Sequence, residues 1–474
     1  MPNSPFPRRD FLRAIAALAG SGAAPLALNL AAINAAAAAN GDYKALVCLF
    51  LQGGNDHYNT VLACDTNSWR AYQTARDSGD NGSIVLPPSE MAGGVLPIGA
   101  ATRQAGRWFA LHPQLGPIKA LFDSYRAAIV ANVGTLIAPL SKAEYLNRSA
   151  AVPPKLFSHN DQQSMWQSCQ PEGARDGWGG RLGDLLAAGN ATASFTCISA
   201  AGNAVFASGR TLSQYQITEA GALPVERLDG MLFDNSRHPL RAIIASPQGN
   251  LLGQQHSALV RRALDTQQLM NAAMAPAGSG GVPHPPPYHS PAANAPRANP
   301  LALQLQTVAR IIAGRTLLGM RRQIFFVSLG GFDTHDYQRG KHTELMARLA
   351  HGIAYFDRTL ANLRGSNLQQ QVTLFTASDF GRTLSSNGDG TDHGWGSHHF
   401  VIGGAVKGHD IYGAFPPVGL GHELDVGQGA LLPQIAVEQY GATLASWFGV
   451  PSSQLGEVFP NLRHFDTRNL GFMS

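Results

Sequence analysis

The sequence has few cysteines, and none of them is closely spaced. Its four cysteines (Cys48, Cys64, Cys169 and Cys197) form no C-x-x-C pair and show no zinc-finger spacing. This absence excludes a zinc-finger fold and a thioredoxin-like redox function. We expect the four side chains to behave as core residues, with a disulfide between two of them as the alternative.

An excess of charge of one sign is also absent. The chain carries 35 Lys and Arg against 31 Asp and Glu, and its basic residues are scattered, so no nucleic-acid partner is expected. The glycine-rich residues 53–56 lack the G-x-G-x-x-G pattern of a dinucleotide site. No G-x-S-x-G elbow surrounds Ser158, which argues against a Ser-His-Asp esterase.

No long uninterrupted apolar run is present either. Residues 14–39 are rich in Ala and Leu but are broken by Gly, Pro and Asn, and a membrane span requires a more apolar stretch. The run follows RRDFL at residues 8–12, a pattern typical of a twin-arginine export signal. We expect residues 1–39 to be this signal peptide, recognised by the twin-arginine translocase, with an ordinary secretory signal or membrane anchor as the alternative. The mature protein then starts near residue 40, in the periplasm or outside the cell, with no stable transmembrane anchor.

Short runs of β-forming residues alternate with helical patterns along the rest of the chain. Five runs that end at glycine or polar residues predict buried strands, at residues 43–51, 127–133, 323–329, 371–377 and 399–402. Helical patterns occupy residues 301–320, 341–363 and 434–448. This alternation predicts an α/β fold, a mainly parallel sheet with helices on both faces.

One segment interrupts the alternation. Residues 274–300 are dense in Pro, Gly, Ala and Ser, which predicts a flexible or extended surface loop. Because strands are predicted on both sides of it, we expect residues 40–474 to form a single α/β domain that carries this loop.

The residues that follow the predicted strands are rich in Asp and His. In a parallel sheet the carboxyl ends of the strands share one edge, where ligands bind. Carboxylates gathered at one edge repel one another unless a cation neutralises them, and oxygen and imidazole donors suit Zn²⁺, Mn²⁺, Mg²⁺ or Ca²⁺. The pattern therefore predicts a divalent metal site with six candidate ligands: Asp56, Asp333, His335, Asp379, Asp392 and His393. His398 and His399 are left out, because one of them begins a strand and packs inward.

A second group of polar residues lies near the middle of the chain. Ser158 stands beside His159 and is a candidate nucleophile with an activating group next to it; the alternative is a cap for the helix that follows. Arg181 and Arg382 are candidates for holding an anionic oxygen, because a guanidinium matches phosphate and sulfate. For Arg181 a surface ion pair is the alternative.

Several of these motifs, in this order, resemble one exported bacterial family. They are the leader, GGND at residues 53–56, LHP at 111–113, SH through WQ at 158–167, GW followed by Arg181, GGFDTH at 330–335, SDFGRT at 378–383, GTDHGWG at 390–396 and VFPNL at 458–462. Together they are similar to the family catalogued as domain of unknown function 1501. The chain is similar, more distantly, to the alkaline phosphatase and sulfatase superfamily, whose sheet edge holds one or two divalent metals beside a Ser, Thr or formylglycine nucleophile.

The superfamily resemblance implies an alkaline phosphatase-like fold and a role for each candidate. It implies Ser158 as the nucleophile, Asp56 as the ligand after the first strand, and Asp333 with His335 as one metal site. It also implies Asp379 and His393 as further ligands. Phe380 stands where superfamily members often have His, and Asp392 with His393 is expected to supply the missing ligand or one metal site is absent. No C-x-P-x-R signature for formylglycine is present, which weakens the sulfatase option.

The expected function is a periplasmic metal-dependent hydrolase of phosphate or sulfate esters. Its substrate would be a small anionic ester or an envelope glycan. The alternative is a catalytically silent relative that keeps the fold and serves as a binding or envelope-assembly protein.

Overall fold

A computed structural model of the protein describes residues 43–79, 82–99, 104, 106–219, 221–222, 246 and 250–474. The predicted signal peptide, residues 1–39, and the predicted start of the mature chain near residue 40 lie outside these residues. Within the described ranges, no helix combines the length and apolar character needed to cross a bilayer.

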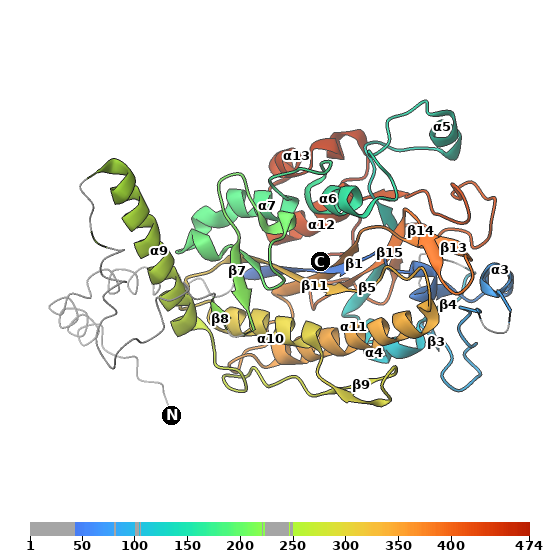
Figure 1. Ribbon diagram of the computed structural model, residues 1–474, viewed down its shortest axis with the longest axis horizontal. Coiled ribbons are helices and arrows are strands. Elements are labelled where there is room, and N and C mark those ends of the chain that lie inside the picture. Colours follow the sequence, from blue (N-terminus) through green and yellow to red (C-terminus); the bar gives the residue numbers. More distant parts are fainter. Residues whose placement is uncertain are drawn as a thin grey trace.

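A ten-stranded sheet runs through the centre of the molecule (Figure 1). Its strands are β1 (Lys44–Gln52), β5 (Ala127–Gly134), β6 (Cys197–Ser199), β7 (Tyr215–Thr218), β8 (Gly221–Ala222), β11 (Arg322–Gly330), β12 (Val372–Ser378), β15 (Ser397–Ile402), β16 (Ile411–Tyr412) and β17 (Ile435–Ala436). They lie in the order β16-β5-β15-β12-β1-β11-β6-β7-β8, with β17 paired to β5. Neighbours from β12 to β7 run parallel, whereas β15 is antiparallel to both β12 and β5.

All five predicted strands are confirmed, as β1, β5, β11, β12 and β15. They read as apolar runs because both faces of the sheet are covered. In β1, Ala45, Val47 and Leu49 pack into the core on one face, while Leu46 and Cys48 pack into the core on the other.

Helices cover both faces of this sheet, which confirms the predicted fold class (Figure 1). One face carries α6 (His159–Ser168), α7 (Trp178–Leu186), α12 (Val437–Phe448) and α13 (Leu455–Val458), and the other carries α4 (Gly116–Asp123), α10 (Pro300–Ala313) and α11 (Gln338–Ala361). The helix predicted at residues 301–320 is shorter than expected, because Gly314 ends α10 and the backbone turns there.

Further helices and strands lie toward the two ends of this sandwich (Figure 1). The helices are α3 (Thr66–Arg76), α5 (Lys142–Asn147) and α9 (Leu251–Ala273), and the strands are β2 (Val61–Ala63), β3 (Leu96–Pro97), β4 (Phe109–Leu111), β13 (Arg382–Ser386) and β14 (Thr391–His393). The 3-10 turns are η1 (His57–Asn59), η2 (Pro113–Leu115), η3 (Ala187–Gly189), η4 (Ala193–Phe195), η5 (Val205–Ala207), η6 (Ser452–Gln454) and η7 (Pro460–His464). β13 and β14 pair as a hairpin.

The segment predicted as a flexible or extended loop, residues 274–300, contains ordered structure. A hairpin of β9 (Tyr288–Ser290) and β10 (Ala295–Arg297) lies beside α11. It is held there because Tyr288 and Ser290 are buried and both donate hydrogen bonds to Glu344 of α11. Composition alone did not show this tertiary anchor.

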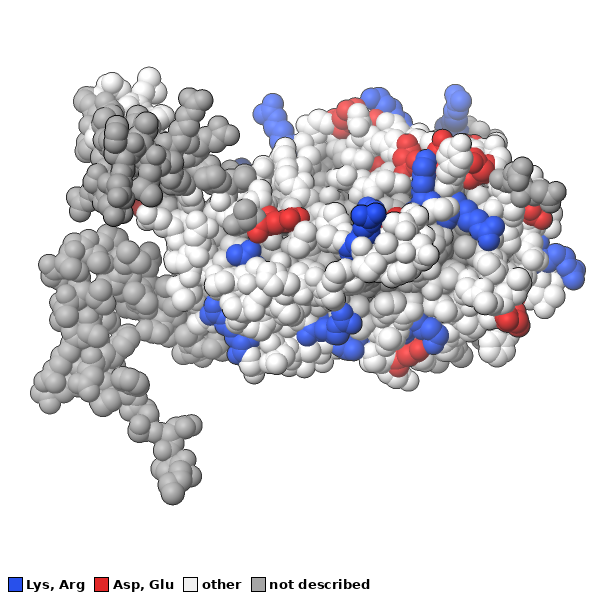
Figure 2. Space-filling model, turned by 60° about the horizontal axis from the view of Figure 1, so that its bottom comes forward, with Lys and Arg blue, Asp and Glu red and all other residues white. Residues whose placement is uncertain are grey.

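The four cysteines are all free thiols. Cys48, Cys169 and Cys197 are buried and Cys64 is half-buried, so the prediction of core residues is confirmed for three of them and no disulfide joins any of the four. The basic residues are dispersed as well. Figure 2 shows Lys and Arg in small separate groups among acidic and uncharged residues.

Candidate metal centre

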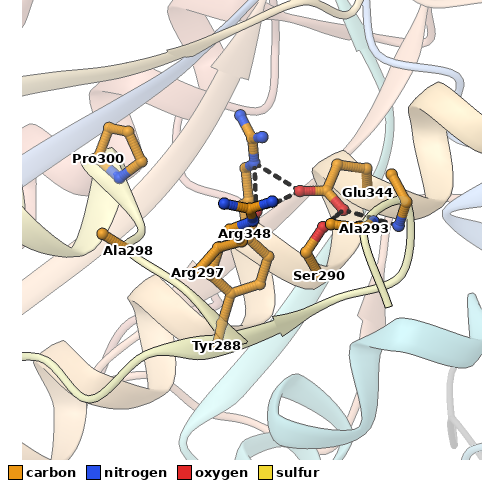
Figure 3. Close-up of a pocket in the computed structure, with 9 residues that line it drawn as sticks. Tyr288, Ser290, Ala293, Arg297, Ala298, Pro300, Glu344 and Arg348 are labelled. Atoms are coloured by element: carbon orange, nitrogen blue, oxygen red, sulfur yellow. Dashed lines mark hydrogen bonds and ion pairs between the residues drawn. The ribbon is translucent and has the colours of Figure 1, made fainter. Parts of the chain in front are cut away.

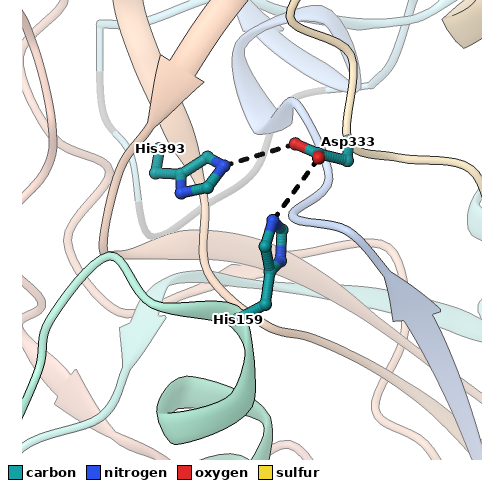
Figure 4. Close-up of side chains that lie close together, drawn as sticks. All are labelled: His159, Asp333 and His393. Atoms are coloured by element: carbon teal, nitrogen blue, oxygen red, sulfur yellow. Dashed lines mark hydrogen bonds and ion pairs between the residues drawn. The ribbon is translucent and has the colours of Figure 1, made fainter.

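Three side chains from distant parts of the chain point toward one another at one edge of the sheet (Figure 4). One ligand atom from each of His159, Asp333 and His393 lies within 4.8 Å of the other two. His159 Nε2 is 3.5 Å from Asp333 Oδ2, and His393 Nε2 is 3.3 Å from Asp333 Oδ1. Ligands at the zinc bond length of about 2.0–2.1 Å stand about 3.3 Å apart around a tetrahedral ion. These separations therefore suit one small divalent ion.

The strand directions explain why these residues meet. β11 and β12 both run parallel to β1, so Asp333 and Asp379, which follow them, emerge at the same edge. β15 is antiparallel to β12, so its amino end lies at that edge too. His393 ends β14 just before β15 begins, which brings this imidazole to the two carboxylates.

Both imidazoles are oriented through their Nδ1 atoms. His159 Nδ1 donates to Asp379 Oδ2 at 2.7 Å, and Gln163 Nε2 donates to the same oxygen at 2.8 Å. His393 Nδ1 donates to the carbonyl oxygen of Phe157 at 2.7 Å. Each ring therefore presents an Nε2 lone pair to Asp333, as metal-binding histidines do when an outer acceptor fixes their tautomer. The Nε2 of His159 is buried and has no hydrogen-bond partner among the described residues.

His335 lies beside this group of three. Its Nε2 is 2.9 Å from His393 Nε2 and 3.1 Å from Asp333 Oδ1, and its Nδ1 is 3.4 Å from Asp392 Oδ1. Two imidazole nitrogens this close need a proton or a cation between them. His335 thus offers a fourth ligand atom, a third imidazole nitrogen, next to the cluster, and Asp392 contacts its other nitrogen.

Arg382 holds the Asp333 carboxylate from the protein side. Its guanidinium is buried and donates to the carbonyl oxygens of Gly53 and Gly54, each at 2.9 Å, and to Asp333 Oδ1. Burial by itself raises the pKa of Asp333, but Arg382 and the neighbouring histidines outweigh it and lower that pKa below its ordinary value. The carboxylate is therefore ionised and able to bind a cation.

The two imidazoles of the cluster differ in their proton affinity. The hydrogen bond to Asp379 raises the pKa of His159. Burial lowers the pKa of His393. A proton therefore competes with a metal more strongly at His159 than at His393.

The structure does not bring Asp56 to this cluster. Asp56 is fully buried, and both terminal nitrogens of Arg76 donate to its carboxylate, as does Gln338 Nε2 at 2.6 Å. Burial raises the pKa of Asp56, but the Arg76 guanidinium outweighs burial and holds that pKa below its ordinary value. Asp56, the ligand expected after the first strand, therefore forms a buried ion pair with Arg76.

Asp379 lies next to the cluster rather than among its three ligands. Its Oδ1 accepts from the Gly53 backbone N–H at 3.1 Å, and its Oδ2 accepts from His159 and Gln163. Both oxygens accept these hydrogen bonds, so a metal held by His159 would contact Asp379 only through that imidazole.

Ser158 directly precedes His159 and is the N-cap residue of α6, but its side chain makes no capping bond to the helix backbone. Its hydroxyl donates instead to Asp161 Oδ2 at 3.0 Å. Arg181 lies away from the cluster. Its Nε donates to the Val458 carbonyl at 2.9 Å, its Nη2 to the Ser168 carbonyl at 2.7 Å and its Nη1 to Asp176, so all three nitrogens bind the protein itself.

The sequence interpretation named His159 only as a neighbour of Ser158 and missed its place in the cluster with Asp333 and His393. A signal was available, because Gln163 follows His159 by four residues and shares its helix face, and both side chains bind Asp379. His398 and His399, which were left out of the site, are both buried within β15.

Comparisons with known proteins give a family and little else. Residues 43–432 match the family model described as "Protein of unknown function (DUF1501)". No curated protein matches the sequence. One solved structure from Bacteroides thetaiotaomicron, described as "Metabolism of multiple glycosaminoglycans by bacteroides thetaiotaomicron is orchestrated by a versatile core genetic locus (BT33494S-sulf)", is similar over 88% of this chain and 74% of that chain, at 11% identity and a TM-score of 0.32. A likeness this weak carries no argument about this chain.

Proposed function

The chain belongs to the family described as protein of unknown function (DUF1501), and we propose that it is a periplasmic metal-dependent hydrolase of phosphate or sulfate esters. One observation carries the proposal: the Nε2 atoms of His159 and His393 converge on the Asp333 carboxylate, with both rings anchored through Nδ1. Three protein ligands and an open position are typical of catalytic zinc sites. Asp333 keeps 48% of its side chain exposed, so the site is accessible.

Each residue of the site has a proposed role. A divalent ion bound there supplies positive charge and lowers the pKa of a water or alcohol. His159, Asp333 and His393 hold the ion, and Asp379 and Arg382 keep His159 and Asp333 in place. Ser158 is the proposed nucleophile, because it directly precedes His159 and its hydroxyl already donates to Asp161, a carboxylate able to take its proton.

A second function is a non-catalytic binding or envelope-assembly protein with one structural metal. One observation favours it. Every guanidinium nitrogen of Arg181 donates to the protein, and so does every one of Arg382, so neither side chain offers an uncommitted fork for an anionic substrate. His335 stands close enough to offer a fourth ligand, and four protein ligands close a zinc site.

Metal analysis of protein purified without chelator or affinity-tag histidines tests the site. We expect metal in the wild-type protein and its loss from Asp333→Asn and His393→Ala while both variants stay folded. His289→Ala is the matched control, because His289 is exposed on β9. A wild-type protein that contains no metal, and binds none when Zn²⁺, Mn²⁺, Mg²⁺ or Ca²⁺ is added back, contradicts the hydrolase and favours a binding protein without a metal.

Turnover separates the two functions. An aryl phosphate and an aryl sulfate are the first substrates to test, each with metal-loaded and metal-stripped protein. The hydrolase predicts metal-dependent turnover that Ser158→Ala abolishes while the metal stays bound. Bound metal without turnover of either ester supports the binding protein, and full turnover by Ser158→Ala contradicts the proposed nucleophile.

The proposed location rests on the RRDFL pattern at residues 8–12. We expect the double variant Arg8→Lys/Arg9→Lys to stay in the cytoplasm and Arg13→Lys, a change in the same leader, to be exported normally. Cell fractionation followed by immunoblotting measures both. Periplasmic accumulation of the double variant would mean that another export route is used.

A further inference from the structure

A separate polar pocket lies between the β9–β10 hairpin and α11 (Figure 3). Its volume is about 610 Å³, and its polar lining comes from Tyr288, Ser290, Arg297, Glu344 and Arg348. None of these residues belongs to the metal cluster, and the size is that of pockets that hold whole small molecules. The pocket is therefore a second candidate ligand site, separate from the metal cluster.

Arg348 is held in place by one nitrogen and leaves two unused. Its Nε donates to Tyr288 Oη and to Glu344 Oε1, both at 2.9 Å, and its guanidinium lies 5.9 Å from the centre of the Tyr288 ring. No hydrogen bond to another described residue uses its Nη1 or Nη2. A guanidinium fixed through Nε presents these two donors as a preformed fork for an oxyanion.

Arg297 brings a second guanidinium to the same pocket. It is the last residue of β10 and is exposed, and its side chain forms no hydrogen bond or ion pair with any described residue. Figure 3 draws its side chain with that of Arg348 among the residues that line the pocket. Two guanidinium groups lining one pocket match the charge of a carboxylate, phosphate or sulfate group, and each can bind two of its oxygens.

Glu344 does not cancel this positive charge. Its carboxylate accepts hydrogen bonds from Tyr288 Oη, Ser290 Oγ, the Ala292 N–H and Arg348 Nε. These donors occupy both of its oxygens, and its charge offsets only that of Arg348. The charge of Arg297 is not offset, so the lining carries a net charge of one positive unit.

The rest of the lining is apolar or weakly polar. Ala292, Ala293, Ala298 and Pro300 complete the wall, and Pro300 begins the 14-residue helix α10, whose amino end adds partial positive charge. A bare phosphate or sulfate fills only a small part of such a pocket, because pockets of about 300–1,000 Å³ accommodate drug-sized molecules. The ligand therefore has an organic body as well as an anionic group.

We propose that this pocket binds a small organic oxyanion, with Arg297 and Arg348 on its carboxylate, phosphate or sulfate group and the Ala and Pro wall against its body. This binding goes beyond the proposed hydrolase activity and does not depend on it. The pocket holds the anion through guanidinium forks alone, so no metal is required.

Calorimetric titration of the purified full chain tests the proposal. The probes are glucose 6-phosphate, glucose 6-sulfate and glucuronate, which share one sugar body and differ in their anion, with glucose as the neutral control and inorganic phosphate and sulfate as bare anions. We expect at least one sugar anion to bind with a Kd below about 1 mM, and glucose not to bind. Arg297→Gln is expected to raise that Kd by about tenfold or more, because it removes hydrogen bonds to a charged group.

Two controls locate the binding. Arg358→Gln changes an exposed arginine on the same helix and is expected to leave Kd within about twofold. Asp333→Asn, which removes a ligand of the metal cluster, is expected to leave it unchanged. The proposal is overturned if no sugar anion binds, if inorganic phosphate binds as tightly as the best of them, or if Asp333→Asn abolishes binding while Arg297→Gln does not.

Discussion

Two Arg–Asp pairs at the ends of neighbouring strands have different surroundings. Asp56 follows β1 and pairs with Arg76 of α3, and both side chains are completely buried. Asp333 follows β11, the neighbour of β1, and binds Arg382 of β13. Here the arginine is buried but 48% of the aspartate side chain is exposed. The two pairs share their chemistry and their position in the sheet but not their access to solvent.

The difference separates a structural ion pair from a candidate ligand site. Arg76 occupies both oxygens of Asp56, which leaves that carboxylate nothing to offer a metal. Arg382 holds Oδ1 of Asp333, which His335 and His393 also approach, whereas Oδ2 faces His159 and is not bound by the arginine. An aspartate after a strand thus becomes a ligand candidate only when its arginine covers one side of it.

Replacing Arg76 should have the largest effect. Arg76→Leu leaves the Asp56 carboxylate buried without its cation, and breaking such a pair costs about 3–5 kcal/mol of unfolding free energy. Urea denaturation measures the loss, and Lys119→Met, which breaks the partly exposed pair with Asp123, should cost less than about 1 kcal/mol. Equal losses of unfolding free energy in the two variants would contradict the larger contribution expected of the buried Arg76–Asp56 pair.

A third carboxylate, that of Glu438, shows how burial changes a pKa when no ion pair is present. Glu438 is buried and accepts from Asn461 Nδ2 at 2.8 Å, and no described Lys or Arg forms an ion pair with it. Burial raises the pKa of Glu438 from 4.5 to about 7, whereas the Arg76 pair lowers the pKa of Asp56.

The sign of the resulting pH dependence follows from proton uptake. The pKa of Glu438 is higher in the folded than in the unfolded protein, so the folded protein binds more protons between pH 4.5 and about 7. The contribution of Glu438 to the unfolding free energy therefore falls as pH rises through that window. We expect Glu438→Gln to remove this pH dependence. Above pH 7 the variant should have an unfolding free energy about 3 kcal/mol higher than that of the wild-type protein. Urea denaturation at pH 5 and pH 8 measures the change, and an identical pH profile in the two proteins would contradict the raised pKa.

Replacing Asp333 tests the solvent-exposed Arg382–Asp333 pair directly. Asp333→Asn should weaken metal binding by more than about 100-fold, since changes one shell further out already weaken it 10- to 100-fold. The melting temperature of the metal-free protein should change little, because Arg382 keeps its bonds to backbone carbonyls. Competition with a chromophoric chelator measures the affinity, and Asp336→Asn, an exposed carboxylate three residues away, is the matched control.

Replacing Asp379 should have the smallest effect. Asp379→Asn removes the carboxylate that accepts from His159 Nδ1 but leaves all three ligands in place, so metal affinity should fall by about 10- to 100-fold. The same chelator competition measures it. A fall as deep as that of Asp333→Asn would mean that Asp379 binds the metal itself.

Much of the architecture follows from local sequence. The apolar runs at β1, β5, β11, β12 and β15 identify strands buried on both faces, because only such strands read as continuous apolar segments. The glycine and Asp or His motifs after them mark one edge of the sheet, because parallel strands end together there. The burial of Cys48 follows from the same pattern, because it lies within β1.

Tertiary structure alone decided which of these polar residues form a site. Asp56 and Asp333 look alike in sequence, but the arginine that another element brings to each of them lies 20 or 49 residues further along the chain. His159 becomes a ligand candidate because α6 begins above Asp379, and the β9–β10 hairpin is ordered because Glu344 of α11 binds it. Periodicity reports which face of an element is apolar, whereas the pairing of buried charges is set by which elements pack together, and only the folded chain contains that information.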